Sequence, residues 1–171
     1  MKIFIMPAIY PCKENRQMGI YIYEQCEVLK KNGHELVILD ASSRNYKEWN
    51  KCNKQYSYSD CNGKVYVNLV RGIAESRLPR LTVVSYVRNI KKIFKKALKE
   101  HGKPDFIYAH FVFPCGYAAS ILSEKYNIPY IVQEHYSLFL EKNLSEYLKK
   151  YYKKDDKKCI VFLLRFGSIE K

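Results

Sequence analysis

Short, nearly continuous apolar runs recur along this chain, separated by longer segments that have helical spacing or turn residues. The runs are KIFIM at residues 2–6, ELVILD at 35–40, KVYVNLV at 64–70, DFIYA at 105–109 and YIVQ at 130–133. Runs of this length that do not alternate with polar residues are typical of strands buried on both faces of a parallel sheet. A further run, CIVFLL at 159–164, is compatible with a sixth strand.

Amphipathic segments stand between several of these runs. Apolar residues recur at helical spacing over residues 22–29, and Gly33 follows where a glycine commonly ends a helix. The clearest amphipathic segment, residues 84–98, has one apolar face and another rich in lysine. A helix of small residues is expected over residues 116–126.

Strands that alternate with helices predict a mostly parallel sheet with helices on both of its faces. The expected fold class is therefore α/β, in the form of a Rossmann-like three-layer sandwich. The polar segment 41–63 shows no clear period and is expected to be irregular. A chain of 171 residues fits one domain. We expect residues 1–150 to form that domain and residues 151–171 to be an atypical or truncated C-terminal tail.

The chain is strongly basic, with 30 Lys and Arg residues against 17 Asp and Glu residues and a formal net charge of +13. Such a charge attracts nucleic acid, anionic membrane surfaces or phosphorylated ligands. Lysines dominate and gather at residues 91–103 and 148–158. A solvated helix face explains such lysines without any ligand, and the helix at 84–98 could instead lie on an anionic membrane.

The six cysteines contain no CxxC pair and have no regular spacing. This argues against a disulfide framework or a zinc knuckle and favours reduced thiols. The N-terminus has no apolar segment long enough for a signal peptide, and no stretch approaches the ~20 apolar residues that span a bilayer. We therefore expect a cytoplasmic protein.

Two histidines end equivalent strands, His110 after the run at 105–109 and His135 shortly after the run at 130–133. Ligands of open parallel sheets bind beyond the carboxyl ends of the strands, so both imidazoles could reach one ligand. Structural histidines are the alternative interpretation. Cys115 and Glu134 lie near them in sequence, but the spacing matches no zinc pattern, and nothing around Cys115 indicates a lowered thiol pKa.

Gly19 stands where the first helix is expected to begin. The N-terminus of a helix presents unpaired N–H groups and partial positive charge to an anion, and a glycine leaves its approach open. A plain N-cap or turn role explains the same residue without a ligand.

Taken together, these pieces resemble the N-terminal domain of family 4 glycosyltransferases, a group of retaining enzymes with the two-domain GT-B architecture. The resemblance rests on MKIFIMPAIYPCKENRQMGIYIYEQCEVLKKNGHELVIL and PDFIYAHFVFPCGYAASILSEKYNIPYIVQEH. It lies in the order of the pieces: a Tyr-Pro loop leading to a glycine, GHE before the second strand, a Pro-Gly turn after PDFIYAH, and IPYIVQEH. The chain would thus be one half of a GT-B fold.

The resemblance implies roles for individual residues. His135 matches the histidine that approaches the transferred sugar, and we assign it as catalytic. Gly19 matches the glycine whose backbone lies near the donor phosphate, and His110 faces the same cleft. Glu134, which precedes His135, is assigned to substrate binding together with Gly19 and His110. The family uses a nucleotide sugar as co-substrate, and we expect no metal and no further cofactor.

The second domain of this family, which holds the nucleotide, is missing from the sequence. We therefore expect a domain that transfers a sugar with retention to a glycan or lipid-linked acceptor, but that is inactive alone. A peripheral contact with the inner membrane face would suit the lysines of residues 91–99. The alternative is a basic, non-catalytic module that binds an anionic membrane or nucleic acid, although no specific nucleic-acid motif is present. A sugar epimerase of related architecture is a second enzyme class.

Overall fold

The computed structural model describes residues 1–12, 15–44, 46–72, 79–135 and 159–163. Its centre is a seven-stranded sheet in the order β4-β5-β2-β1-β7-β8-β9. The strands are β1 (Lys2–Met6), β2 (Glu35–Asp40), β4 (Tyr56–Ser59), β5 (Lys64–Val67), β7 (Phe106–His110), β8 (Tyr130–Glu134) and β9 (Cys159–Leu163). Every neighbouring pair is parallel except β4 with β5, which confirms the mostly parallel sheet.

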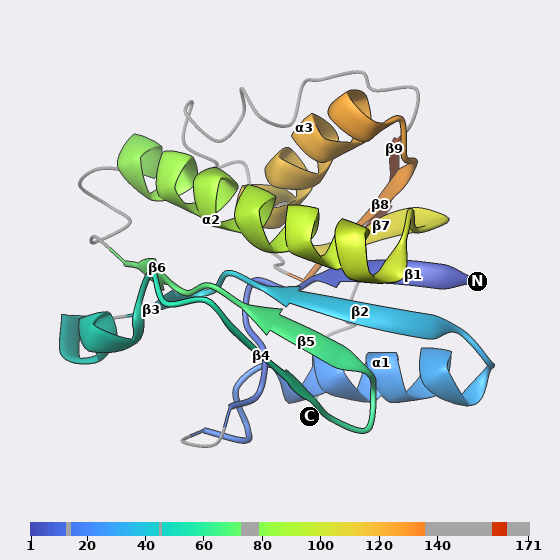
Figure 1. Ribbon diagram of the computed structural model, residues 1–171, viewed down its shortest axis with the longest axis horizontal. Helices are drawn as coiled ribbons and strands as arrows, with labels where there is room; N and C mark the ends of the chain where they lie inside the picture. Colours follow the sequence, from blue (N-terminus) through green and yellow to red (C-terminus); the bar gives the residue numbers. More distant parts are fainter. Residues whose placement is uncertain (13–14, 45, 73–78, 136–158, 164–171) are drawn as a thin grey trace, which may run out of the picture.

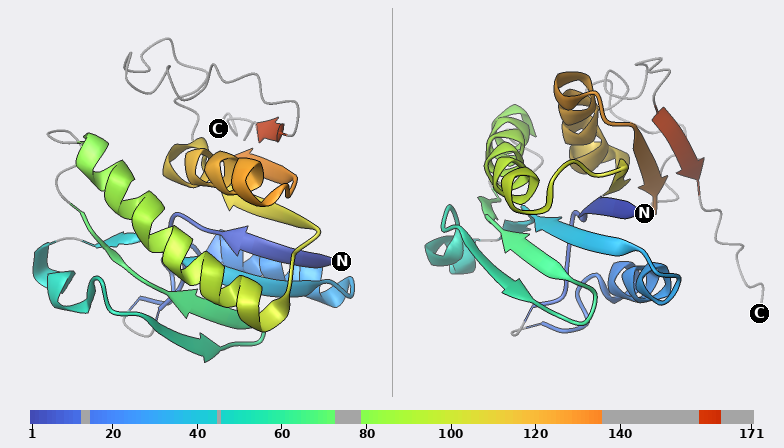
Figure 2. Two further views of the ribbon diagram at one scale, coloured as in Figure 1. Left: turned by 45° about the horizontal axis from the view of Figure 1, so that its top comes forward. Right: turned by 45° about the vertical axis from the view of Figure 1, so that its right-hand side comes forward.

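Helices cover both faces of the sheet. The helix α1 (Ile20–Lys31) lies on one face, and α2 (Pro79–His101) and α3 (Tyr117–Tyr126) lie on the other, as Figures 1 and 2 show. A short π-helical turn, η2 (Val112–Gly116), leads into α3. These three layers confirm the expected α/β sandwich.

The central strand β1 shows why the sheet needs two helical layers. Ile3 and Ile5 belong to the apolar cluster on the α1 side, whereas Phe4 and Met6 belong to the cluster on the α2 and α3 side. Successive side chains of a strand point to opposite faces, so an uninterrupted apolar run is buried twice. The ring of Phe4 meets the ring of Phe94 from α2 with centroids 5.5 Å apart.

The helix α2 separates its apolar and basic residues. Ile90, Phe94 and Ala97 are buried against the sheet. The opposite side is exposed and carries Lys91, Lys92, Lys95, Lys96 and Lys99. Proline begins this helix, where its missing N–H costs no intrahelical hydrogen bond.

The prediction of an irregular segment 41–63 was wrong in part. This segment contains β3 (Ser43–Arg44), a 3₁₀ helix η1 (Tyr46–Lys51) and the edge strand β4. The strand β3 pairs with β6 (Val70–Arg71) in a small second sheet. The strand β4 is held by backbone pairing with β5 and has the polar sequence YSYS. Because that sequence contains no apolar run, the sequence did not predict this strand.

The strand β9 lies inside the predicted tail 151–171 and pairs in parallel with β8, from Tyr130 with Cys159 to Glu134 with Leu163. The other residues of that tail, and the lysine cluster at 148–158, lie outside the described residues. The boundary at residue 150 therefore stays a prediction.

Strand order places the ligand-binding edge. Moving along the chain from β1, the sheet grows through β2 and β5 on one side and through β7, β8 and β9 on the other. Ligands of such sheets bind at the carboxyl ends of the strands, where this order reverses. Here that point lies between β1 and β7, beside the loop that follows β1 and the residues that follow β7 and β8.

Candidate functional site

An imidazole pair stands at the carboxyl ends of β7 and β8. His110 is the last residue of β7, and His135 follows β8 directly. Nδ1 of His110 lies 3.0 Å from Nε2 of His135, and the two rings stack with centroids 5.3 Å apart. The structure thus brings together the two histidines that the sequence placed at equivalent strand ends.

Burial keeps this pair neutral. His110 is fully buried, and desolvation, with a smaller contribution from His135, lowers its pKa to about 3. Desolvation also lowers the pKa of His135, which is half-buried. At neutral pH one imidazole therefore donates the shared proton and the other accepts it. Nε2 of His110 is buried and has no hydrogen-bond partner among the described residues.

Aromatic rings surround both imidazoles. The ring of Tyr108 lies 4.5 Å from that of His110, and the rings of Tyr21 and Phe111 lie 4.8 Å and 5.0 Å from that of His135. Phe111 has a φ of 73°, a backbone conformation that residues other than glycine rarely adopt. Such strain persists only where surrounding contacts enforce it, and it is frequent at functional sites.

The carboxylate of Glu134, the residue before His135, binds backbone N–H groups. Glu134 is almost fully buried, and its carboxylate oxygens accept hydrogen bonds from the N–H of Val112 at 2.9 Å and the N–H of His135 at 2.8 Å. The carboxylate therefore ties the end of β8 to the turn η2. A contact between Glu134 and substrate stays a prediction.

Gly19 is the N-cap of α1 and has a φ of 72°. A Cβ at this position would lie 2.6 Å from the backbone oxygen of Ile9, so the close approach is to the first loop itself. Asn15 orders the loop before it, since its side-chain oxygen accepts hydrogen bonds from the N–H groups of Gln17 and Met18. Gly19 stands two residues before Tyr21, whose ring contacts His135, so the first loop and the imidazole pair are neighbours.

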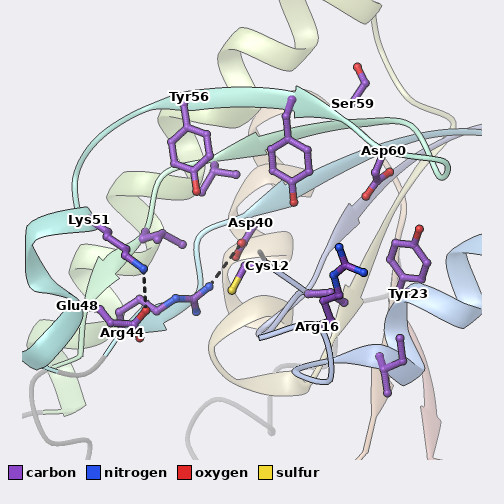
Figure 3. A pocket seen from close by; sticks show the side chains of 15 residues that line it. Cys12, Arg16, Tyr23, Asp40, Arg44, Glu48, Lys51, Tyr56, Ser59 and Asp60 are labelled. Atoms are coloured by element: carbon purple, nitrogen blue, oxygen red, sulfur yellow. Dashed lines mark hydrogen bonds and ion pairs between the residues drawn. The ribbon is translucent and has the colours of Figure 1, made fainter. Parts of the chain in front are cut away.

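A hollow of about 750 Å³ lies beside the first turn of α1 (Figure 3). We call it the first-loop hollow. Ile20 lines this hollow while the adjacent Tyr21 contacts His135, so one helical turn separates the hollow from the imidazole pair. Its polar and aromatic lining residues are Cys12, Arg16, Tyr23, Asp40, Arg44, Glu48, Lys51, Tyr56, Tyr58, Ser59 and Asp60.

The chain is also similar to known proteins in sequence and in fold. Residues 18–165 match the family model described as Glycosyltransferase Family 4. The chain belongs to glycosyltransferase family 4.

One relative of this family 4 chain is a putative teichuronic acid biosynthesis glycosyltransferase of Bacillus subtilis strain 168. It is 27% identical over 142 residues, which cover 79% of this chain and 36% of the relative. A solved structure of sucrose-phosphate synthase from Thermosynechococcus elongatus superposes with a TM-score of 0.54 at 15% identity, covering 99% of this chain and 91% of that chain. This structural likeness shows the fold, which is similar to the domains of GT-B glycosyltransferases.

Sequence reasoning missed the first-loop hollow of this family 4 domain. Its lining comes from the first loop, from the start of α1 and from the segment 40–69. Much of that last segment has no hydrophobic period, so the sequence did not predict that it folds back toward the first loop. The one available signal was the Tyr-Ser-Tyr alternation at 56–58, which puts two tyrosines on the same face of a strand.

Three further features of the described part of this family 4 chain concern metal, thiol and membrane-spanning sites. Within it, no group of three or more His, Cys, Asp or Glu residues could hold a metal ion. Cys115 is buried, the hydroxyl of Tyr86 donates to its sulfur at 3.1 Å, and burial raises its thiol pKa to about 12. Among the described helices, none has the length and apolar character needed to cross a bilayer.

Proposed function

We propose that this chain is the acceptor-side domain of a retaining glycosyltransferase. The reaction moves a sugar from a nucleotide-sugar donor to a glycan or lipid-linked acceptor. One observation carries the proposal: in a family 4 chain, ring nitrogens of His110 and His135 lie 3.0 Å apart at the carboxyl ends of β7 and β8. The name of the Bacillus relative, which refers to teichuronic acid biosynthesis, supports a glycan acceptor.

His135 is the proposed catalytic residue because it is the more exposed member of the pair. As a neutral imidazole it donates a single hydrogen bond to a hydroxyl or to developing charge, which positions the sugar without a strong base. His110 and Glu134 act through it: His110 fixes the ring of His135 through the 3.0 Å contact, and Glu134 fixes its backbone N–H. The backbone around Gly19 would face the donor phosphate.

The chain matches 36% of the length of its Bacillus relative, and we propose that it does not turn over alone. The test uses the full chain by itself and the full chain fused to the C-terminal half of that relative. With labelled nucleotide sugars and glycan acceptors, we expect no transfer from the chain alone and measurable transfer from the fusion. Transfer by the unfused chain would contradict the proposed dependence on a second domain.

His135→Ala in the fusion tests the assigned role. Removing a group that stabilises transition-state charge lowers kcat by roughly 10²-fold or more. The matched control is His34→Ala, because His34 precedes β2 at the amino-terminal ends of the parallel strands, whereas His135 lies at their carboxyl ends. A His135→Ala fusion that works at the unmodified rate would refute the catalytic assignment.

We further propose that the domain works at the cytoplasmic face of the membrane and touches anionic lipid through α2. The support is the exposed lysine face of that helix, together with Leu81 and Val84, which are 51% and 65% exposed near its start. Cationic side chains beside exposed apolar ones suit an anionic lipid surface. Vesicle flotation tests this contact.

A further inference from the structure

The first-loop hollow has the size and the mixed lining of a small-molecule site. Its volume of about 750 Å³ falls within the roughly 300–1,000 Å³ of ligand pockets. It lies beside β2 and β5, on the opposite side of β1 from the histidines. The first turn of α1 lines the hollow with Ile20 and contacts His135 with Tyr21, so this turn connects the hollow to the imidazole pair.

The carboxylates of the hollow are already engaged within the protein. Arg44 pairs with Asp40 at 4.0 Å with both side chains buried, and Lys51 pairs with Glu48 at 3.4 Å. The oxygens of Asp60 accept hydrogen bonds from the hydroxyl of Tyr10 and from the N–H groups of Asn62 and Gly63.

Arg16 differs from these groups. Within the described ranges, which leave out the neighbouring residues 13–14, its guanidinium takes part in no ion pair or hydrogen bond. Figure 3 shows it directed into the hollow between Cys12 and Tyr23. A guanidinium offers planar, paired donors that match a carboxylate or phosphate. Among the described lining residues, Arg16 is therefore a cation that a ligand can use.

Two tyrosines of β4 supply a flat apolar wall. The rings of Tyr56 and Tyr58 have centroids 6.4 Å apart and planes 23° from parallel. Burial raises the pKa of Tyr58, so its hydroxyl stays protonated and able to donate. Ring faces of this kind pack against the C–H face of a sugar, while the hydroxyls at their edges bond to its oxygens.

We propose that the first-loop hollow binds a saccharide that carries an anionic group, with Arg16 holding the anion and Tyr56 and Tyr58 holding the sugar ring. This rests on the proposed function, since the saccharide would be the acceptor of the transfer. The anion is a carboxylate or a phosphate, two groups that a guanidinium binds in the same paired geometry.

Binding to the full chain tests the proposal without any need for turnover. Two-dimensional NMR titrations would compare glucuronate, glucose 6-phosphate, glucose, inorganic phosphate and uridine monophosphate. We expect the two anionic sugars to bind roughly tenfold or more tightly than glucose and than inorganic phosphate, because both halves of the site must be filled. Tighter binding of glucuronate would identify the anion as a carboxylate, and tighter binding of glucose 6-phosphate as a phosphate.

Two variants and a control assign the binding to these residues. Arg16→Gln should remove the preference for the anionic sugars and leave glucose binding unchanged. Tyr56→Ala should weaken binding of all three sugars. Arg88→Gln removes the same charge from the exposed side of α2 and should change nothing. Spectra of each free variant show whether it is folded.

Several results would overturn the proposal: equal binding of glucose and glucuronate, tightest binding of uridine monophosphate, or Arg16→Gln binding like the unmodified chain. The proposed function fails separately. If the fusion described above transfers sugar while no anionic sugar binds here, only the acceptor class is wrong. If the sugars bind but the fusion is inactive, the hollow is a saccharide site outside a transferase.

Discussion

Gly19 connects the sequence motif to the geometry of the site at the scale of one residue. Its φ of 72° is left-handed, and the missing side chain leaves room for the backbone oxygen of Ile9. The first loop can therefore fold tightly over the start of α1. This fold sets where Tyr21 meets His135 and where Arg16 meets the hollow.

Gly19→Ala should destabilise the domain by about 2–4 kcal/mol, because it adds a left-handed Cβ and a steric clash at 2.6 Å. Gly33→Ala is the matched control. Gly33 has a φ of 80° but no atom within 4 Å of its added Cβ, so this change should cost only about 1–2 kcal/mol. Urea unfolding of both variants measures the difference, and equal losses would show that the contact with Ile9 has no energetic weight.

The sequence predicted that the two histidines lie close together, but it did not predict the first-loop hollow. His110 and His135 follow apolar runs, and the carboxyl ends of neighbouring parallel strands meet at one edge, so their proximity followed from pattern alone. Arg16 and Asp60 both line the hollow only because the segment after β2 folds back beside the first loop. No local period encodes such a return.

At the scale of elements, α2 shows how one helix can serve the core and a possible membrane contact. Its buried stripe of Ile90, Phe94 and Ala97 packs on the sheet. Packing therefore leaves the lysines on the other side exposed.

The triple change Lys91→Gln, Lys95→Gln and Lys99→Gln should lower affinity for anionic vesicles by about 100-fold at low salt, since each lysine near the surface contributes about 1 kcal/mol. Binding to neutral vesicles should be weak for every form. The control, Lys30→Gln with Lys31→Gln and Lys54→Gln, removes the same charge from exposed positions outside α2. Equal losses in both triple variants would reduce the effect to net charge and contradict a specific contact.

Elements were predictable where burial dictates their pattern. The strand β2 is apolar because both of its faces are covered, and its bounds, Glu35–Asp40, are those expected from the sequence. The edge strand β4 has a polar sequence and is held by backbone pairing with β5, so hydrophobicity did not reveal it. Edge strands of this kind depend on a neighbour that a local pattern does not show.

At the scale of the whole molecule, β1 divides the edge formed by the carboxyl ends of the parallel strands into two parts. The imidazole pair stands beyond β7 and β8, and the first-loop hollow stands beside β2 and β5. The loop after β1 and the start of α1 touch both parts. A change in the first loop is therefore expected to affect both the proposed catalytic residue and the proposed acceptor site.

The buried imidazole also links the stability of the whole domain to pH. The pKa of His110 is lowered to about 3 in the folded chain, against about 6.5 for an ordinary histidine. Above pH 6.5 His110 is neutral in both states, so its contribution does not change with pH. Below pH 6.5 His110 binds a proton in the unfolded state but not in the folded state. The free energy of unfolding therefore falls as the pH is lowered, until the pH reaches the pKa of His110 in the folded state.

Between pH 7 and pH 5 this one group should lower the free energy of unfolding by about 2 kcal/mol. His110→Asn should remove that part of the loss. The variant retains His135, whose pKa is also lowered, so a smaller loss of stability at low pH should remain. Urea unfolding of both proteins at pH 8, 7 and 5 measures the effect, and the interval from pH 8 to 7 serves as the internal control. If the two proteins lose equal stability between pH 7 and 5, the imidazole at position 110 is not held neutral by burial.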